Sequence, residues 1–146
     1  MSGKLTQAKH FVDTHILIYA HDLDAGDKHI RASEVVRTLW ESGTGVLSTQ
    51  VLQEFYVNVT RKIPQPLPLS TARGLVGAYG AWNVSCPTIE TLLAASEIQE
   101  RHQLSFWDAM IVAAAQEAGA DALLTEDLNH GQLIEGIRVM NPLVSS

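Results

Sequence analysis

The stretch "SFWDAMIVAAAQEAGADALLT", residues 105–125, joins a helix-length apolar segment to a short apolar run. Nine of the ten residues from 106 to 115 are apolar, which is typical of a helix buried on all sides. The run "DALLT" (121–125) has the length of a buried strand. The stretch therefore predicts a helix over 105–118 that leads directly into a strand.

The same alternation of short apolar runs and helix-length patterns extends along the whole chain. It is typical of βαβ units, and it predicts one α/β domain over residues 1–146, with a parallel β-sheet flanked by helices on both faces. Residues 1–9 are expected to form a disordered or frayed N-terminus. The remaining strands are predicted at 10–13, 45–49, 83–86 and, as an edge candidate, 137–141; the remaining helices at 28–42, 50–63, 70–80 and 88–102.

Composition excludes several classes of protein. The chain is 46% hydrophobic and 18% charged, which excludes a disordered chain, and no apolar run reaches the roughly 18 residues of a membrane span. The N-terminus has no signal-like apolar stretch, and the single cysteine, Cys86, cannot form an intrachain disulfide, so we expect a cytoplasmic protein. The net charge of -6 argues against holding nucleic acid by phosphate neutralisation alone.

Two acids follow predicted strands. Asp13 ends the first strand, and Asp127 follows "DALLT" within two residues. Open parallel sheets bind ligands beyond the carboxyl ends of their strands, near a topological switch point. Each acid alone is explained equally well as a turn or N-cap residue.

Two further acids lie on predicted helices. Glu54 is too deep in its helix for capping and falls outside the apolar stripe, so alone it fits a solvated surface acid. Asp108 stands three residues after Ser105, as in a capping box. Together, however, four carboxylates in one cleft repel each other unless they are protonated or bridged by cations such as Mg²⁺ or Mn²⁺. Such a pocket suits metal-assisted cleavage of phosphodiesters.

Four segments, "FVDTHILIYA", "QVLQEFYVNV", "LSFWDAMIVAAA" and "LLTEDLNHGQ", in this order resemble the PIN-domain ribonucleases, most closely the VapC-type toxins of bacterial toxin-antitoxin pairs. The resemblance runs from about residue 10 to the C-terminus. It implies that Asp13, Glu54, Asp108 and Asp127 hold one or two Mg²⁺ or Mn²⁺ ions, with help from the hydroxyl of Thr125.

One departure from the family concerns the residues after the first acid. The family usually has Thr-Asn there, whereas this chain has Thr14 and His15. The histidine either packs and forms hydrogen bonds or ligates the metal, in which case Mn²⁺ is favoured over Mg²⁺.

The sequence thus predicts a Mg²⁺- or Mn²⁺-dependent endoribonuclease that cleaves RNA and works as a homodimer, the toxin neutralised by a small cognate antitoxin. Two alternatives stay open. One is a receiver-like Mg²⁺-binding signalling module, although the late lysine it needs is absent, since Lys62 is the last lysine. The other is a catalytically inactive PIN-like binding protein. Trp107, beside Asp108, is expected to be a core residue.

Overall fold

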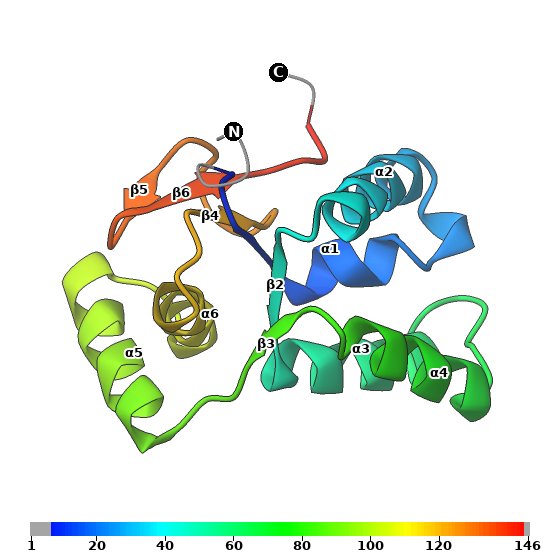
Figure 1. The fold of residues 1–146 in the computed structure, drawn as a ribbon, viewed down its shortest axis with the longest axis horizontal. Coiled ribbons are helices and arrows are strands. Elements are labelled where there is room, and N and C mark those ends of the chain that lie inside the picture. The colour runs from blue at the N-terminus through cyan, green and yellow to red at the C-terminus, as the bar shows by residue number, and fades with distance from the viewer. Residues whose placement is uncertain (1–6, 145–146) are drawn as a thin grey trace.

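The computed structural model describes residues 7–144, which contain a six-stranded sheet in the order β3-β2-β1-β4-β6-β5 (Figure 1). Neighbouring strands pair in parallel, except that β5 runs antiparallel to β6. The predicted α/β fold is confirmed, with a mostly parallel sheet. The strands are β1 His10–Val12, β2 Gly45–Ser48, β3 Asn83–Ser85, β4 Ala122–Leu124, β5 Leu133–Ile134 and β6 Ile137–Met140.

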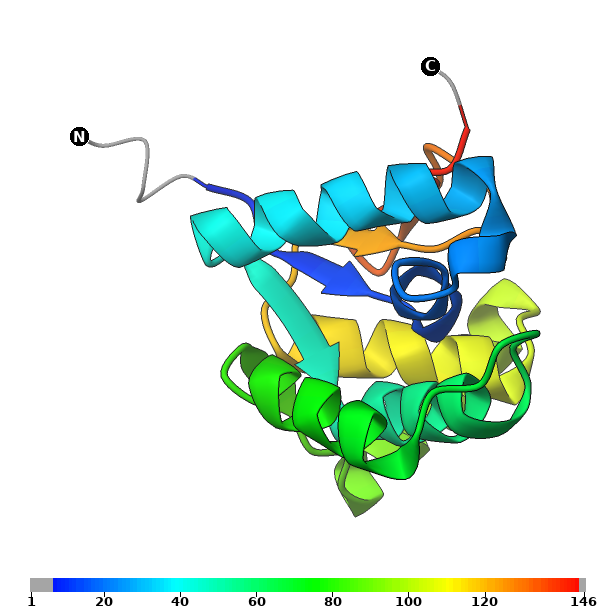
Figure 2. The same cartoon turned by 90° about the vertical axis from the view of Figure 1, so that its right-hand side faces the viewer.

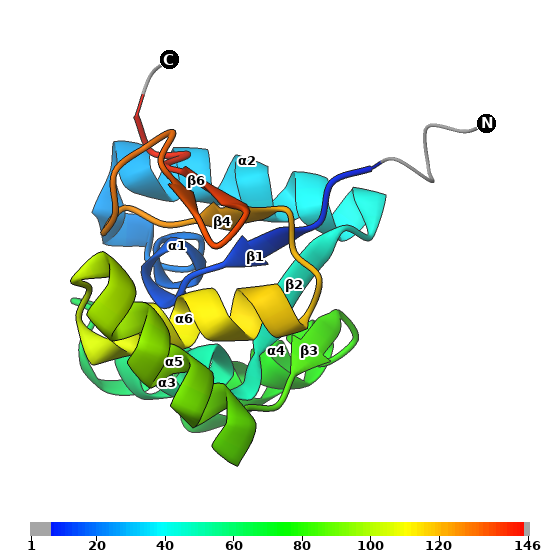
Figure 3. The ribbon, with the colours of Figure 1, turned by 90° about the vertical axis from the view of Figure 1, so that its left-hand side faces the viewer.

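Helices cover both faces of the sheet. Helices α5 and α6 lie on one side, and α1 to α4 lie on the other, as the two side views show (Figures 2 and 3). This arrangement follows from right-handed crossovers, because the chain moves outward from β1 to β3 and then returns to β4. The helices are α1 Thr14–Tyr19, the 3₁₀ turn η2 Leu23–Ala25, α2 Asp27–Ser42, α3 Thr49–Arg61, α4 Leu69–Tyr79, α5 Ile89–His102 and α6 Phe106–Glu117.

The order of the strands reverses between β1 and β4, which are neighbours in the sheet although far apart in the sequence. Val12 is in register with Leu124, and the amide of Asp13 donates to the carbonyl of Leu124 at 3.0 Å. The residues that follow the two strands therefore lie side by side. This is the switch point at which open α/β sheets bind ligands.

Helix α6 packs against α5 and against the sheet. Its residues from Ala109 to Ala115 are all buried, and five of these seven side chains are alanine or valine, so the helix packs close to the sheet. The apolar pattern of the sequence predicted this burial. Helix α6 contacts β2, β4 and β6, and its first turn emerges at the carboxyl edge of the sheet. None of the described helices is long and apolar enough to cross a membrane.

Three features differ from the sequence predictions or lie outside them. Helix α1, over a stretch to which no element was assigned, is too short for a helical period to stand out. The prediction of 137–141 as an edge strand is wrong, because the two-residue strand β5 pairs outside β6. Residues 1–6 of the predicted frayed N-terminus lie outside the described residues, and the amide of Lys9 donates to Asp121 Oδ2 at 2.9 Å.

Candidate active site

Asp13 is the most deeply placed acid at the carboxyl edge of the sheet. It directly follows β1 and caps α1, since its Oδ1 accepts from the amide of Thr14 at 2.7 Å. Its Oδ2 accepts from the hydroxyl of Thr125 at 2.7 Å. Burial, with a smaller contribution from the nearby charge of Asp127, raises the pKa of Asp13 to about 6, although the two hydrogen bonds act to lower it. A buried carboxylate of this kind is best stabilised as an anion by a cation.

Thr125 links the ends of β1 and β4. Besides donating to Asp13, its hydroxyl accepts from the amide of Asp127 at 3.1 Å, while its own side chain is buried. The hydroxyl therefore fixes the turn after β4 and holds Asp127 next to Asp13. Asp127 itself is exposed to solvent.

Glu54 reaches the site from α3. Ser48, the last residue of β2, caps this helix by accepting from the amide of Val51 at 3.2 Å. The exposed Glu54 is held by Thr14, whose buried hydroxyl donates to Glu54 Oε1 at 2.8 Å. Asp13 is thus linked through Thr125 to the turn that carries Asp127, and the next residue, Thr14, is linked to Glu54 on α3.

Asp108 lies in the first turn of α6. Its amide donates to the hydroxyl of the cap residue Ser105 at 3.1 Å. Partial burial raises the pKa of the Asp108 carboxyl, the Ser105 hydroxyl lowers it, and the charge of Asp127 raises it. Because Asp127 raises the pKa of both Asp13 and Asp108, the three carboxyl groups form one electrostatic cluster.

The structure brings all four predicted acids to one cavity of about 260 Å³. Within residues 7–144 no lysine or arginine lines it. Thr14 and His15 also line this cavity, whereas Thr125 lies beneath it as the partner of Asp13. The lining residues are Asp13, Thr14, His15, Gln50, Glu54, Asn58, Trp107, Asp108, Ile111 and Asp127.

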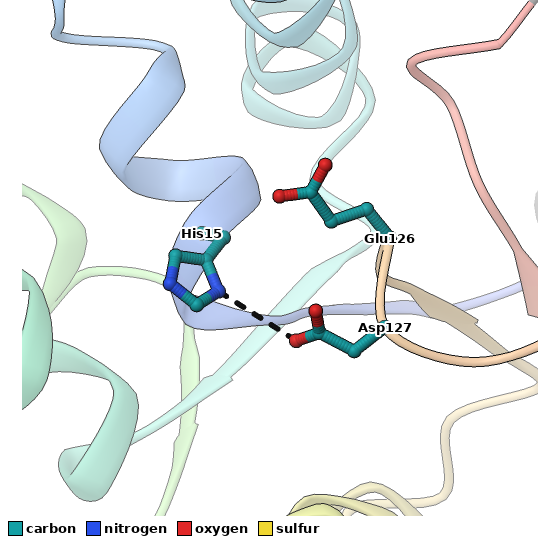
Figure 4. A group of neighbouring side chains, drawn as sticks. All are labelled: His15, Glu126 and Asp127. Atoms are coloured by element: carbon teal, nitrogen blue, oxygen red, sulfur yellow. Dashed lines mark ion pairs between the residues drawn. The ribbon is translucent and has the colours of Figure 1, made fainter.

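A second acid after β4 lies close to the cluster. Figure 4 shows His15, Glu126 and Asp127 converging from α1 and the turn after β4, with one ligand atom of each within 4.8 Å of the others. His15 Nδ1 lies 3.6 Å from Asp127 Oδ2. Glu126 also accepts from the hydroxyl of Tyr19 at 2.6 Å and from Lys28 Nζ at 3.1 Å. The site therefore contains oxygen donors of the type that hold divalent cations, with one imidazole beside them.

At the site, one residue lies in a different environment from the one predicted, and another was not predicted to belong to the site. Trp107 was expected in the core, but its side chain is 63% exposed and lines the cavity. The reason is its place in the first turn of α6, where the helix emerges beyond the sheet. Glu126 was not singled out, although its position next to Asp127 was a usable signal.

The model of the PIN domain family matches residues 10–134, which include all of these acids. The chain belongs to the PIN domain family. Among solved structures, VapC20 of Mycobacterium tuberculosis, described as a toxin that cleaves the sarcin-ricin loop, superposes with a TM-score of 0.61 at 22% identity over 82% of this chain and 90% of that one. No curated protein matches the chain in sequence.

Two complexes share the PIN fold over nearly their full length. A toxin-antitoxin complex from Klebsiella pneumoniae has a TM-score of 0.68 at 21% identity, covering 92% of this chain and 98% of that one. DNA-bound VapBC from Salmonella typhimurium has a TM-score of 0.63 at 17% identity, covering 93% and 99%. At these identities the likeness concerns the fold.

Proposed function

We propose that this PIN domain is a divalent-metal-dependent endoribonuclease and the toxin of a toxin-antitoxin pair. The observation that carries the proposal is the convergence of four carboxylates on a cavity that no lysine or arginine of the described part of the chain lines. Such a cavity repels a phosphodiester unless cations neutralise it, so the acids and the substrate require the same metal ions. Membership of the PIN family and the fold shared with VapC-type toxins support the reaction.

Each acid has a role that follows from its environment. Asp13, Asp108 and Asp127 are the proposed metal ligands, and Thr125 orients Asp13 through its hydrogen bond to Oδ2. Glu54 is proposed to ligate the ion or to orient the attacking water. Because Thr14 donates to Glu54 Oε1, the second carboxylate oxygen is left to accept from that water.

When bound, the metal would neutralise the phosphate and lower the pKa of a water molecule. In-line attack of the water on the scissile phosphorus forms a new P–O bond and breaks the bond to the 3′ oxygen. The products are a 5′-phosphate and a 3′-hydroxyl. In this proposal the acids would hold the water and the phosphate in line, Glu54 would take a proton from the water, and the leaving 3′ oxygen would take up a proton from solvent.

Mg²⁺ is the proposed ion, with Mn²⁺ as the alternative. Carboxylate oxygens suit both ions, whereas a nitrogen ligand shifts the preference toward Mn²⁺. In this proposal the preferred ion depends on whether His15 ligates it, because His15 Nδ1 lies 3.6 Å from Asp127 Oδ2. Mn²⁺ should support cleavage better than Mg²⁺ only if His15 ligates.

The partners follow from the same proposal. The antitoxin is expected to place a cation, most simply an arginine, among the carboxylates, since a guanidinium fork matches such oxygens. The homodimer is supported by large apolar side chains exposed on α5, including Ile89 and Leu93. We also propose that the protein acts in the cytoplasm, where its RNA substrate is found.

The test is cleavage of single-stranded RNA by the purified chain with Mg²⁺, with Mn²⁺ and in excess EDTA. We expect cleavage only with metal, products with 5′-phosphates, and loss of cleavage in Asp127→Asn. The matched control is Asp24→Asn, which removes an exposed acid that does not line the cavity. Undiminished cleavage in EDTA would refute the metal mechanism, and no cleavage under any condition would favour the inactive binding protein.

A further inference from the structure

The indole of Trp107 is the largest exposed aromatic surface at the candidate active site. Its side chain is 63% exposed, although large apolar side chains are normally buried. It lines the same cavity as Asp13, Glu54 and Asp127. An apolar ring at this position is not needed for metal binding.

The indole is also held in place. Phe106 meets it edge-on, with ring centroids 5.5 Å apart and ring planes at 70°, and Phe106 itself packs against the core. Ser105 fixes the backbone of this turn by capping α6. A ring that its neighbours hold in one orientation loses little conformational freedom when a ligand stacks on it, so the entropic cost of binding that ligand is low.

The charge of the site restricts what can hold the substrate. Among the described residues no lysine or arginine lines the cavity, and the nearby Lys28 is paired with Glu126. With a net charge of -6 as well, the chain offers few contacts from basic side chains to the phosphates next to the reacting one. Proteins that bind single-stranded nucleic acid have a second source of affinity, which is the stacking of bases on aromatic rings. Trp107 is the indole available for it at this cavity.

We propose that Trp107 stacks on a nucleobase adjacent to the scissile phosphate and is the main base-binding residue of the site. This inference rests on the proposed function, since it takes single-stranded RNA as the ligand. Stacking is tolerant of sequence because every base has a π-face. It also requires an unpaired base, so Trp107 favours single strands and loops over duplex RNA.

The first experiment measures binding without cleavage. The probe is a fluorescently labelled oligoriboadenylate in Ca²⁺, which also binds carboxylate oxygens. It is compared with an oligomer of equal length made of abasic ribose phosphates, which carries the same charge but no bases. We expect wild type to bind the first probe more tightly than the second, and its tryptophan fluorescence to be quenched by the first alone.

Three substitutions separate stacking from apolar contact. Trp107→Ala and Trp107→Leu should weaken binding of the oligoriboadenylate by roughly 5- to 150-fold, whereas Trp107→Phe should retain most of it. All three should bind the abasic oligomer as wild type does. The leucine variant is the matched control, because it keeps apolar area but has no π-face.

Several results would overturn the inference. If the leucine variant binds as well as the phenylalanine variant, the contact is apolar rather than stacked. If RNA affinity is unchanged but the oligomeric state or antitoxin binding is altered, Trp107 belongs to a protein interface. Loss of affinity for the abasic oligomer would point to a general defect of the site instead.

Cleavage in Mg²⁺ keeps the two proposals distinguishable. Trp107-dependent binding without any cleavage would overturn the proposed function and leave the base-binding residue standing. Cleavage with the same kcat/KM in wild type and in Trp107→Ala would overturn the role of Trp107 in base binding and leave the proposed function standing.

Discussion

The substitution Asp13→Asn should make the metal-free protein gain stability relative to wild type as the pH rises. Burial raises the pKa of Asp13 from 3.8 to about 6, so the fold holds the proton of this carboxyl more tightly than the unfolded chain does. The stability that results is complete below about pH 3.8 and is lost as the pH rises through about 6. At about 1.36 kcal/mol per pKa unit, the loss is about 3 kcal/mol.

Asparagine has nearly the same shape but no charge to bury. It changes the hydrogen bond in which Thr125 donates to Oδ2, and this change costs about 1 to 3 kcal/mol. That cost is the same at each pH. It therefore cancels when the difference in unfolding free energy between the two proteins is compared at two pH values.

The assay is urea unfolding of both proteins in EDTA at about pH 4 and about pH 7. The free-energy difference should shift in favour of the variant by about 2 to 3 kcal/mol between these two pH values. Asp24→Asn, an exposed acid away from the cavity, controls for the change in net charge. Mg²⁺ should then stabilise wild type more than the variant. A free-energy difference that stays constant between the two pH values would refute the reasoning, because the buried charge would then carry no cost.

Three further outcomes are expected. Thr14→Val removes the hydroxyl that holds Glu54, so RNA cleavage should fall while thermal melting shows a loss of about 1 to 2 kcal/mol; Thr14→Ser should restore both. Ser105→Ala removes the cap of α6 and should lower the free energy of unfolding in urea by about 1 kcal/mol. Mg²⁺ binding measured by calorimetry should also weaken, because the turn that carries Asp108 loosens. An unchanged midpoint of urea unfolding would contradict this. Gly45→Ala places a Cβ against the indole of Trp82 and should cost about 1 to 3 kcal/mol, which a wild-type melting temperature would exclude.

Most of the fold could be predicted because its elements carry local signals. The apolar stretch of α6 from Ala109 to Ala115 is buried, as its pattern predicted, and the predicted helix over 28–42 differs from α2 by one residue. Local signals fail where an element spans fewer than two of its own periods, so that no repeat of the pattern can be seen. Helix α1 has six residues and β5 has two, and both form because their neighbours in space pair with or cover them.

In the candidate site, too, some residues could be placed from signals in the sequence and others could not. Asp13 and Asp127 could be placed from the sequence, because the carboxyl ends of neighbouring parallel strands meet at one edge. The position of Trp107 could not, since an all-apolar helix gives no sign of which turn leaves the core. The bond from Thr14 to Glu54 joins residues 40 positions apart and depends on how α1 packs on α3. That the four acids ligate a cation stays a prediction.

The two explanations of Asp108 from the sequence make different demands on its carboxyl group. The capping box predicted from the sequence needs the Asp108 carboxyl to accept from the amide of Ser105, whereas the bond found in the described residues is its other half, in which the amide of Asp108 donates to the Ser105 hydroxyl. The cavity uses its carboxyl group, whose pKa is raised by burial and by the charge of Asp127, and is lowered by the hydroxyl of Ser105. A capping acid that complements the helix dipole would have its pKa lowered overall. The upward shift therefore fits the metal-site explanation better than the capping one, since a cation shared with Asp13 and Asp127 would favour the charged form.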